Sequence, residues 1–309
     1  MYSFIVNPHS RSGRGLEIWN KLKPILENRS IAYKVYFTEK ANHANELVEE
    51  VSADGGEHTL IILGGDGTID EVLNGISDFD KIKIGYIPTG SSNDFARSLK
   101  LPTDPIKALD NILSATTTKP LDIGVLTYGN KTRDFMVSAG IGFDAAVCHQ
   151  AAVSKWKSLM NHLGLGKLTY VAIALSRILF SKAKAMTLTL DDNAPLHFDR
   201  TYFVAFMNHP YEGGGFKFCP DAKYDDGLLD VIVAHNISKA RILTILPQAF
   251  SGKHVGKKGI EVYTCHKASV NSVVPLPVHT DGEPIYTGQN ISATLANKQI
   301  HLLVQAKDV

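Results

Sequence analysis

The chain has little cysteine, and what it has is widely spaced. Its 309 residues include three cysteines, Cys148, Cys219 and Cys265, with no C-x-x-C pair of the kind that binds zinc or forms a redox couple. An odd number of distant cysteines also argues against a disulfide-stapled secreted domain. We therefore expect reduced, buried thiols and a cytoplasmic protein.

The chain also lacks an excess of either charge and any long hydrophobic run. Its 32 basic and 31 acidic residues nearly cancel, so no global field favours nucleic acid and we expect no nucleic-acid partner. The longest apolar stretch, Leu168 to Phe180, contains Arg177 and is too short for a membrane-spanning helix. The first residues, MYSFIVNPHS, do not resemble a secretory signal. We expect a soluble protein large enough for two domains.

The first part of the chain alternates between two kinds of pattern. Apolar runs typical of buried strands, such as Tyr2 to Val6 and Thr59 to Leu63, are followed by helical segments at Leu16 to Leu26, Asn42 to Val51, Thr68 to Ile76 and Asn93 to Leu99. This alternation predicts a Rossmann-like parallel α/β domain over residues 1–125. Glycine-rich and polar segments follow the strands, and such folds bind ligands at the carboxyl ends of their strands.

The second part of the chain has short β-like runs separated by turns. They predict a mostly antiparallel β-sandwich domain over residues 126–298, interrupted by helices near 142–181 and 238–250. Roughly the last ten residues are expected to return to the first domain. Because no repeat or flexible linker separates the domains, we expect a tight interface with the ligand cleft between them.

The segment GGDGT, Gly64 to Thr68, has the composition of a phosphate-binding loop. Its glycines permit positive φ, and a helix starting near Thr68 would point unpaired N–H groups at an anion. Thr68 to Glu71 also fits a capping box, which would explain the segment without a ligand. Asp66 would repel phosphates unless a divalent cation bridges them, so it predicts a nucleotide bound with Mg²⁺.

Together with this loop, other segments make the chain recognisable. They are Asn7-Pro8, Ser10 to Gly15, Thr38-Glu39, Glu71 with Asn74-Gly75, Pro88 to Gly90, Asn93 to Ala96, and Asp281 to Glu283. In these segments the chain resembles the diacylglycerol kinase type of lipid kinase and, more distantly, sphingosine and ceramide kinases. The resemblance covers nearly the whole chain. The family's usual Gly-Thr-Ala-Asn-Asp is Gly-Ser-Ser-Asn-Asp here, which keeps a small residue and a hydroxyl.

The resemblance implies an ATP- and Mg²⁺-dependent kinase that phosphorylates the hydroxyl of a neutral lipid, with diacylglycerol, giving phosphatidic acid, as the first choice of acceptor. A sphingoid base, a glycolipid or a soluble polyol is the alternative acceptor. An alternative of another class is a nucleotide-responsive membrane-binding protein with little turnover. A homodimer is compatible with the resemblance.

The resemblance also implies the site residues. ATP would be bound by Asn7, Ser10, Gly13, Thr38, Gly64, Gly65, Asp66, Gly67, Thr68, Thr89, Gly90, Asn93 and Asp94. The nucleotide's metal would be held by Asp66, Asp94 and Glu283, while Asp281 would take the proton from the acceptor hydroxyl. Asp281, Glu283 and Asp66 therefore form the predicted catalytic set.

Simpler structural explanations stay open for several of these residues. Asp281-Gly282 alone reads as a tight hairpin turn, and Ser92 to Asp94 as a plain helix N-cap. Arg11 and Arg14 would neutralise the transferred phosphoryl group or are merely solvated. Gly213 to Gly215 would flank the acceptor pocket or form a sharp turn.

Asp225 and Asp226 mark a second predicted metal site. Family members carry a structural Mg²⁺ in a loop that Asp221 to Asp230 resembles. Lys223 stands where relatives often show an acidic residue, so a simple acidic turn is an equal alternative.

One basic and apolar segment is predicted to meet the membrane. Between Asp144 and Asp191 there is no acidic residue, and Lys155, Lys157 and Lys167 lie among large apolar residues. Such a stretch binds anionic bilayers, so we expect a lipid substrate and peripheral association with the inner face of the membrane. Leu168 to Phe180 fits a core helix better.

Overall fold

In the computed structural model of the protein, the described residues are 1–142, 145 and 182–305. The helices predicted within 142–181, Cys148, and the membrane-binding residues Lys155, Lys157 and Lys167 lie outside them. The chain forms two compact units, unit 1 (Met1–Asp122 with Asn297–Val309) and unit 2 (Ile123–Ala296). Two long strands, β5 (Thr117–Tyr128) and β13 (Glu283–Val304), each contribute residues to both units.

Unit 1 is built on a parallel sheet. Its strands are β1 (Tyr2–Val6), β2 (Tyr33–Phe37), β3 (His58–Gly64) and β4 (Ile82–Pro88), in the order β2-β1-β3-β4, and the end of β13 pairs parallel with β4. Leu60 to Leu63 are completely buried. A strand with both faces covered is a continuous apolar run, as this one is. The predicted Rossmann-like α/β fold is confirmed.

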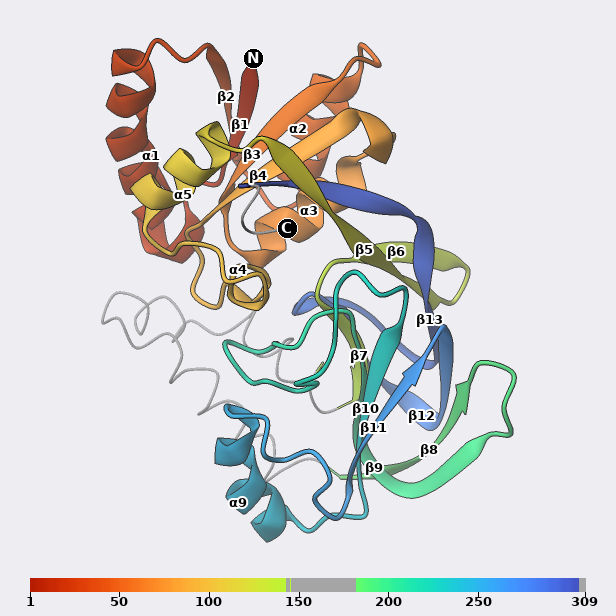
Figure 1. Ribbon diagram of the computed structural model, residues 1–309. Coiled ribbons are helices and arrows are strands. Elements are labelled where there is room, and N and C mark those ends of the chain that lie inside the picture. Colours follow the sequence, from red (N-terminus) through yellow and green to blue (C-terminus); the bar gives the residue numbers. More distant parts are fainter. Residues whose placement is uncertain (143–144, 146–181, 306–309) are drawn as a thin grey trace. The chain divides into compact units, whose positions relative to one another are not determined.

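Helices cover both faces of this sheet (Figure 1). α1 (Ser10–Asn28) and α5 (Pro105–Leu113) contact each other on one face, and α2 (His43–Ser52) and α3 (Asp66–Gly75) contact each other on the opposite face. The short helices η1 (Phe79–Lys81) and α4 (Asp94–Ser98) flank β4. Trp19 and Leu22 of α1 and Leu109 of α5 form one core with β1, β3 and β4.

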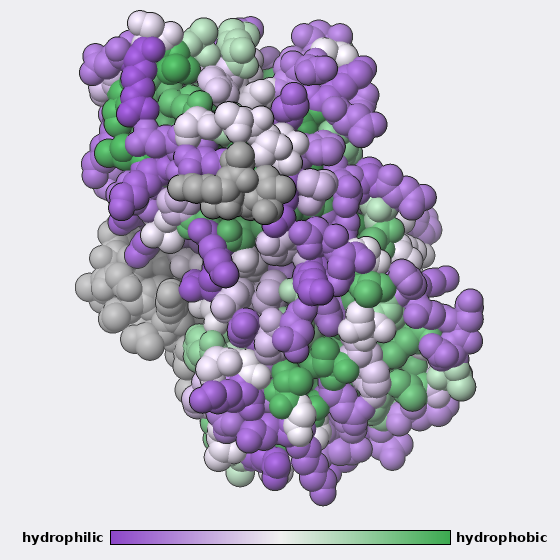
Figure 2. Space-filling view, in the orientation of Figure 1, coloured by the Kyte–Doolittle hydropathy of each residue, from purple (hydrophilic) through white to green (hydrophobic). Residues whose placement is uncertain are grey.

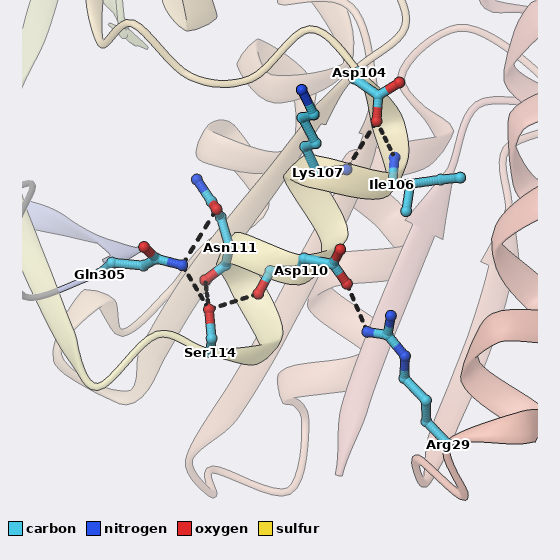
Figure 3. Close-up of polar contacts among 8 residues, drawn as sticks. All are labelled: Arg29, Asp104, Ile106, Lys107, Asp110, Asn111, Ser114 and Gln305. Atoms are coloured by element: carbon cyan, nitrogen blue, oxygen red, sulfur yellow. Dashed lines mark hydrogen bonds and ion pairs between the residues drawn. The ribbon is translucent and has the colours of Figure 1, made fainter.

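The last described residue, Gln305, contacts helix α5 of unit 1 (Figure 3). Gln305 Nε2 donates to Ser114 Oγ at 2.7 Å and to Asn111 Oδ1 at 3.3 Å, both at the end of α5. Arg29 and Asp110 form an ion pair at 2.6 Å that joins α1 to α5. These contacts hold the last part of the chain and the two helices on one face together.

Unit 2 is mostly antiparallel β structure. Its elements are β6 (Lys131–Phe135), β7 (Ser138–Gly142), β8 (Lys184–Leu190), β9 (Leu196–Met207), β10 (Leu229–His235), α9 (Lys239–Ala249), β11 (Ile260–Cys265) and β12 (Lys267–Thr280), with most of β13 and part of β5. β9 and β12 are long, and each pairs with β8 along one half and with β7 along the other. The strands enclose a core of buried residues that includes Phe135, Phe206 and Val278. The predicted β-sandwich is confirmed.

The surface mixes hydrophilic and hydrophobic residues. Figure 2 shows the hydrophobic residues of the face drawn there in small groups rather than in one belt. Within the part of the chain that the structure describes, no helix has both the length and the apolar character needed to cross a membrane. Cys219 and Cys265 are free and buried, as expected.

Candidate active site

The strand order of unit 1 fixes where a ligand would bind. From β1 the chain moves to β2 on one side, whereas β3 and β4 lie on the other side of β1. Open α/β sheets bind ligands at such a switch point, beyond the carboxyl ends of the strands. Asn7 follows β1 and Gly64 ends β3, so both lie at this point.

The loop after β1 is held close to the glycine loop. Asn7 Nδ2 donates to Thr68 Oγ1 at 3.1 Å, and the Asn7 Oδ1 accepts from the His9 N–H at 3.1 Å. A Cβ on Gly15 would lie 2.0 Å from the Asn7 carbonyl oxygen, so only glycine fits there. Gly15 therefore lets the start of α1 pass directly against the end of β1.

This loop continues into the first residues of α1, where the backbone is not helical. Arg11, Ser12 and Gly13 have φ of 45°, 60° and 98°, although the first two are not glycine. Left-handed residues of this kind store strain and cluster at functional sites, and successive backbone N–H groups in such turns form anion-binding concavities. The predicted nucleotide residues Ser10 and Gly13 lie on this loop.

Two more of the predicted nucleotide-binding residues follow β2 and β4. Ser10 Oγ and Thr89 Oγ1 are 2.6 Å apart and buried, and the Thr89 N–H donates to the Gly64 carbonyl at 2.8 Å. The Thr38 N–H donates to the Val6 carbonyl at 2.9 Å, and Thr38 is buried. The structure thus brings the hydroxyls of Ser10 and Thr89 into contact and places the Thr38 backbone beside the end of β1.

The two glycine loops touch through their backbones. A Cβ on Gly90 would lie 2.6 Å from Gly65 Cα and 2.8 Å from Asn93 Oδ1, and a Cβ on Gly64 would lie 2.4 Å from Thr68 Cβ. No side chain fits between them. The close approach leaves the segments 64–68 and 88–94 as one continuous surface of backbone and hydroxyl groups.

This contact gives a stability prediction. Gly90→Ala should lower the free energy of unfolding by about 1–3 kcal/mol, because a methyl group would have to separate two backbones. It should also raise the KM for ATP. Thermal melting and ATP kinetics measure the two effects, with Gly56→Ala as control, since its Cβ would meet only the flexible Asp54 side chain. Equal melting of the two variants would show that the loops separate freely.

Asp66 has a structural task that the sequence did not reveal. Its Oδ2 accepts from the Asp94 N–H at 3.1 Å and its Oδ1 from the Phe95 N–H at 3.2 Å, which are the first two amides of α4. Asn93 occupies the N-cap position, but its side chain does not cap the helix. The segment Ser92 to Asp94 does hold the N-cap position, as the structural explanation has it, but the side chain that caps α4 is Asp66 of the other loop.

The predicted capping box is wrong. α3 begins at Asp66 rather than near Thr68, with Gly65 as an N-cap that offers no side chain. Glu71 instead accepts from the Asn42 N–H at 2.9 Å and the Ala44 N–H at 3.1 Å, at the start of α2. Glu71 therefore caps the neighbouring helix α2 rather than its own helix α3.

Negative charge gathers between the two glycine loops. Burial raises the pKa of Tyr86 well above its usual range, and the nearby charges of Asp66 and Asp94 raise it further. Asp94 is buried and pairs with Arg97 at 3.3 Å. Asn93 Oδ1 is buried with no hydrogen-bond partner among the described residues. Two carboxylates and an amide carbonyl are hard oxygen donors, so these residues fit a Mg²⁺ ion.

Unit 2 holds Asp281 in a two-residue hairpin turn. Thr280 pairs with Glu283 across the turn, and Asp281 and Gly282 have φ of 49° and 81°, as a type I′ turn requires. The Asp281 carboxylate accepts three backbone N–H groups, from Met136 (2.7 Å), Val137 (2.7 Å) and Ser138 (2.9 Å). The turn is confirmed, and the carboxylate binds a second segment as well.

The electrostatics of Asp281 favour a base. Burial raises the pKa of Asp281, an effect that the three backbone N–H groups and the nearby His279 partly oppose. A carboxylate with a raised pKa accepts a proton more readily at neutral pH. The hydrogen bonds fix its position while burial increases its basicity.

Sequence reasoning missed the partners of this turn. The Gly282 N–H donates to His279 Nδ1 at 3.3 Å, so His279 Nε2 carries the proton and faces Glu212 Oε1 at 3.3 Å. His279 and Glu212 are both buried. Glu212 lies 67 residues before His279 in the sequence, and no local pattern connects them. Together they brace the turn that carries Asp281.

Comparisons with known proteins agree with both units. Residues 1–126 match the family described as diacylglycerol kinase catalytic domain, and residues 136–298 match the YegS C-terminal NAD kinase beta sandwich-like domain. A diacylglycerol kinase of Staphylococcus epidermidis is 30% identical over 99% of this chain and 92% of its own length. One of Mycobacterium tuberculosis is 29% identical over 90% and 87%. The chain belongs to the diacylglycerol kinase family.

Solved structures of other proteins have the same fold as this chain. A diacylglycerol kinase from Bacillus anthracis aligns over 100% of the chain and 98% of its own with a TM-score of 0.70 and 20% identity. An NAD kinase from Archaeoglobus fulgidus in complex with ATP aligns over 100% and 95% with a TM-score of 0.50 and 13% identity. At these identities the similarity is one of fold.

The other predicted metal residues of the kinase lie apart from Asp66 and Asp94 in the sequence. Glu283 is exposed at the first position of β13. In the second predicted metal loop, Asp226 Oδ1 accepts from the Leu228 N–H at 3.2 Å, which forms a local turn. Burial raises the pKa of Asp230, and the charge of Lys223 lowers it. Lys223 therefore supplies positive charge to this acidic loop.

The described residues contain no group of side chains typical of a metal site built from histidine, cysteine, aspartate and glutamate alone. Across residues 1–142 and 182–305, no three histidine, cysteine, aspartate or glutamate side chains are grouped so that they could hold a metal ion.

Gly213, Gly214 and Gly215 have φ of 67°, 87° and 111°, and Glu212 and Phe216 exchange backbone hydrogen bonds across them. These glycines form a sharp turn.

Proposed function

We propose that the protein transfers the γ-phosphoryl group of ATP to the free hydroxyl of diacylglycerol and so produces phosphatidic acid. The observation that carries the proposal is the convergence in unit 1 of the loops after β1, β3 and β4, which join through Asn7–Thr68, Ser10–Thr89 and Thr89–Gly64. Backbone N–H groups, hydroxyls and two carboxylates together suit a triphosphate bound with its metal ion.

In this proposal most of the residues bind and orient the charged nucleotide, and only Asp281 takes part in a proton transfer. The backbone of 64–68 and the left-handed loop of Arg11 to Gly13 would bind the phosphates. Asp66, Asp94 and Glu283 would hold Mg²⁺, which when bound neutralises charge on the phosphoryl oxygens. Arg11 and Arg14 would add positive charge. Asp281 would take the proton of the acceptor hydroxyl as the oxygen–phosphorus bond forms.

The choice of acceptor rests on the relatives. Two proteins named diacylglycerol kinase are 29% and 30% identical to this chain, over 90% and 99% of its length. Diacylglycerol stays in the bilayer, so we propose that the kinase works in the cytoplasm, bound peripherally to the inner face of the membrane.

A lipid-phosphorylation assay tests the proposal. The purified protein should convert diacylglycerol to phosphatidic acid with ATP and Mg²⁺, faster than it phosphorylates sphingosine, ceramide or glycerol, and ATP consumption without lipid should be slow. Mass spectrometry of the lipid product identifies the acceptor. Preferred phosphorylation of another acceptor would replace diacylglycerol, and ATP consumption unaffected by any lipid would contradict a lipid kinase altogether.

A further inference from the structure

Helix α9 has an apolar side that the fold does not use. Ile245 packs into a core with strands β9, β10 and β11, and Ala249 is also buried; α9 is drawn in teal in Figure 1. The opposite side exposes Ala240, Leu243 and Pro247, at the spacing of one helix face. Of the nine large apolar side chains exposed in the described ranges, three lie close together in sequence here: Leu243 (38%), Phe250 (46%) and Val255 (37%).

Polar side chains on this side hydrogen-bond to the helix itself. Thr244 Oγ1 donates to the Arg241 carbonyl at 2.8 Å, Gln248 Nε2 to the Thr244 carbonyl at 2.9 Å, and Ser251 Oγ to the Gln248 carbonyl at 3.1 Å. Burying a polar group is costly only when it has no partner. This side of the helix can therefore be buried in an apolar environment while these three donors keep their hydrogen bonds.

Phe250 packs against a buried aromatic ring although its own side chain is exposed. Its ring stacks on the buried Phe216 ring, with centroids 4.2 Å apart and planes at 26°. The Lys217 N–H also donates to the Ala249 carbonyl at 2.8 Å. An aromatic side chain fixed in this way loses little freedom when it enters another phase.

The charge of this region has one sign. From Val231 to Ile260 the chain has five lysines and arginines and no aspartate or glutamate. Arg241, Lys253, Lys257 and Lys258 are exposed, and none of them forms an ion pair with a described residue. The charges of these four side chains are therefore not paired with acidic groups of the described residues.

We propose that α9 and residues 250–258, together called the α9 surface, dock on a bilayer that contains anionic lipid. Leu243, Phe250 and Val255 would enter the headgroup region, and the basic side chains would face lipid phosphates. An anionic lipid interface accepts exposed apolar side chains and positive charge together. The inference rests on the proposed function, because a bilayer-bound acceptor requires the kinase to reach a membrane.

Vesicle flotation without ATP tests the α9 surface. The protein should bind vesicles of phosphatidylcholine with phosphatidylglycerol and bind pure phosphatidylcholine weakly. Replacing Lys253, Lys257 and Lys258 by glutamine should lower the partition coefficient roughly 100-fold, at about fivefold per basic residue near the surface. Leu243→Ser with Val255→Ser should lower it as well. The control replaces Lys21, Lys34 and Lys107, exposed lysines of unit 1, and should bind within about fivefold of the parent.

The outcomes separate this inference from the proposed function. Phosphorylation of short-chain diacylglycerol dispersed in detergent should be unchanged in the α9 variants. If the parent binds anionic vesicles through α9 but phosphorylates no lipid, the proposed function fails and the docking surface stands. Equal binding by the triple variant and the parent, equal binding to neutral vesicles, or tighter binding to nucleic acid than to vesicles would overturn the docking surface.

Discussion

Replacing Asp281 by asparagine should lower kcat by about 10²- to 10⁴-fold, the contribution expected of a general base. The amide cannot accept the proton of the acceptor hydroxyl, whereas the residues proposed to bind the ATP phosphates belong to unit 1. The KM for ATP should therefore change little. Steady-state kinetics with detergent-dispersed diacylglycerol and a direct ATP-binding measurement check both expectations.

The structure shows that this substitution also has a cost to stability. Asn-Gly is a good type I′ turn, so sequence reasoning predicts no structural change. However, one carboxylate oxygen accepts from Met136 and the other from Val137 and Ser138, so the asparagine NH₂ must face a backbone N–H. We expect a loss of about 1–3 kcal/mol in the free energy of unfolding.

A matched control is available in the same unit. Asp191 has φ of 49°, and its Oδ1 alone accepts the His266 and Lys267 N–H groups, both at 2.9 Å. Asp191→Asn can keep both hydrogen bonds, so activity should stay within about twofold and stability should change by less than about 1 kcal/mol. Asp281→Asn with activity as high as this control would leave Asp281 as a turn residue only.

The pH profile distinguishes a base from a structural residue. A base must be deprotonated, so kcat/KM should fall as the pH drops through the pKa of Asp281, and burial raises that pKa. The acid limb should therefore lie above the ordinary aspartate value of about 3.9. In Asp281→Asn this limb should disappear, which a loss of stability alone would not produce.

The sheet of unit 1 could be predicted from the sequence because a parallel strand that is buried on both faces is a continuous apolar run. Leu60 to Leu63 is uniformly apolar and proved to be completely buried. α5 was missed, although Asp104 caps it and Pro105 occupies its first turn, a recognisable start signal. β12 and β13 were read as several short strands, because a bulge between Asn271 and Leu276 breaks their alternation.

Sequence motifs name the candidate site residues, but they do not show which of these residues contact one another. The glycines at 64, 65 and 90 are explained by the close approach of two loops, which only the fold creates. The amides that hold Asp281 lie 143 to 145 residues earlier in the chain. Glu71 was assigned to its own helix because a capping box is a local pattern, whereas its partners belong to α2. A hydrogen bond between distant segments produces no recognisable pattern in the sequence around either partner.

Asp66→Asn is expected to lower kcat/KM by about 10²- to 10³-fold, the typical loss when one group aimed at developing charge is removed. The carboxylate would help to hold the metal ion of the nucleotide, and an amide binds Mg²⁺ more weakly because it carries no charge. The activity of the variant should therefore need more Mg²⁺ to reach its maximum. A Mg²⁺ titration at fixed ATP, together with ATP binding measured with and without Mg²⁺, checks this.

The cap that Asp66 provides for α4 requires a control, because asparagine also replaces one of two oxygens that accept backbone N–H groups. Asp104 caps α5 in the same unit by accepting the Ile106 and Lys107 N–H groups at 3.1 and 2.9 Å (Figure 3). Asp104→Ala should lower the free energy of unfolding by about 0.5–2 kcal/mol and leave kcat/KM unchanged. If Asp66→Asn loses no more stability than this control yet loses activity and shifts its Mg²⁺ requirement, the carboxylate acts on the bound nucleotide. If its Mg²⁺ requirement is that of the parent, Asp66 serves only to cap α4.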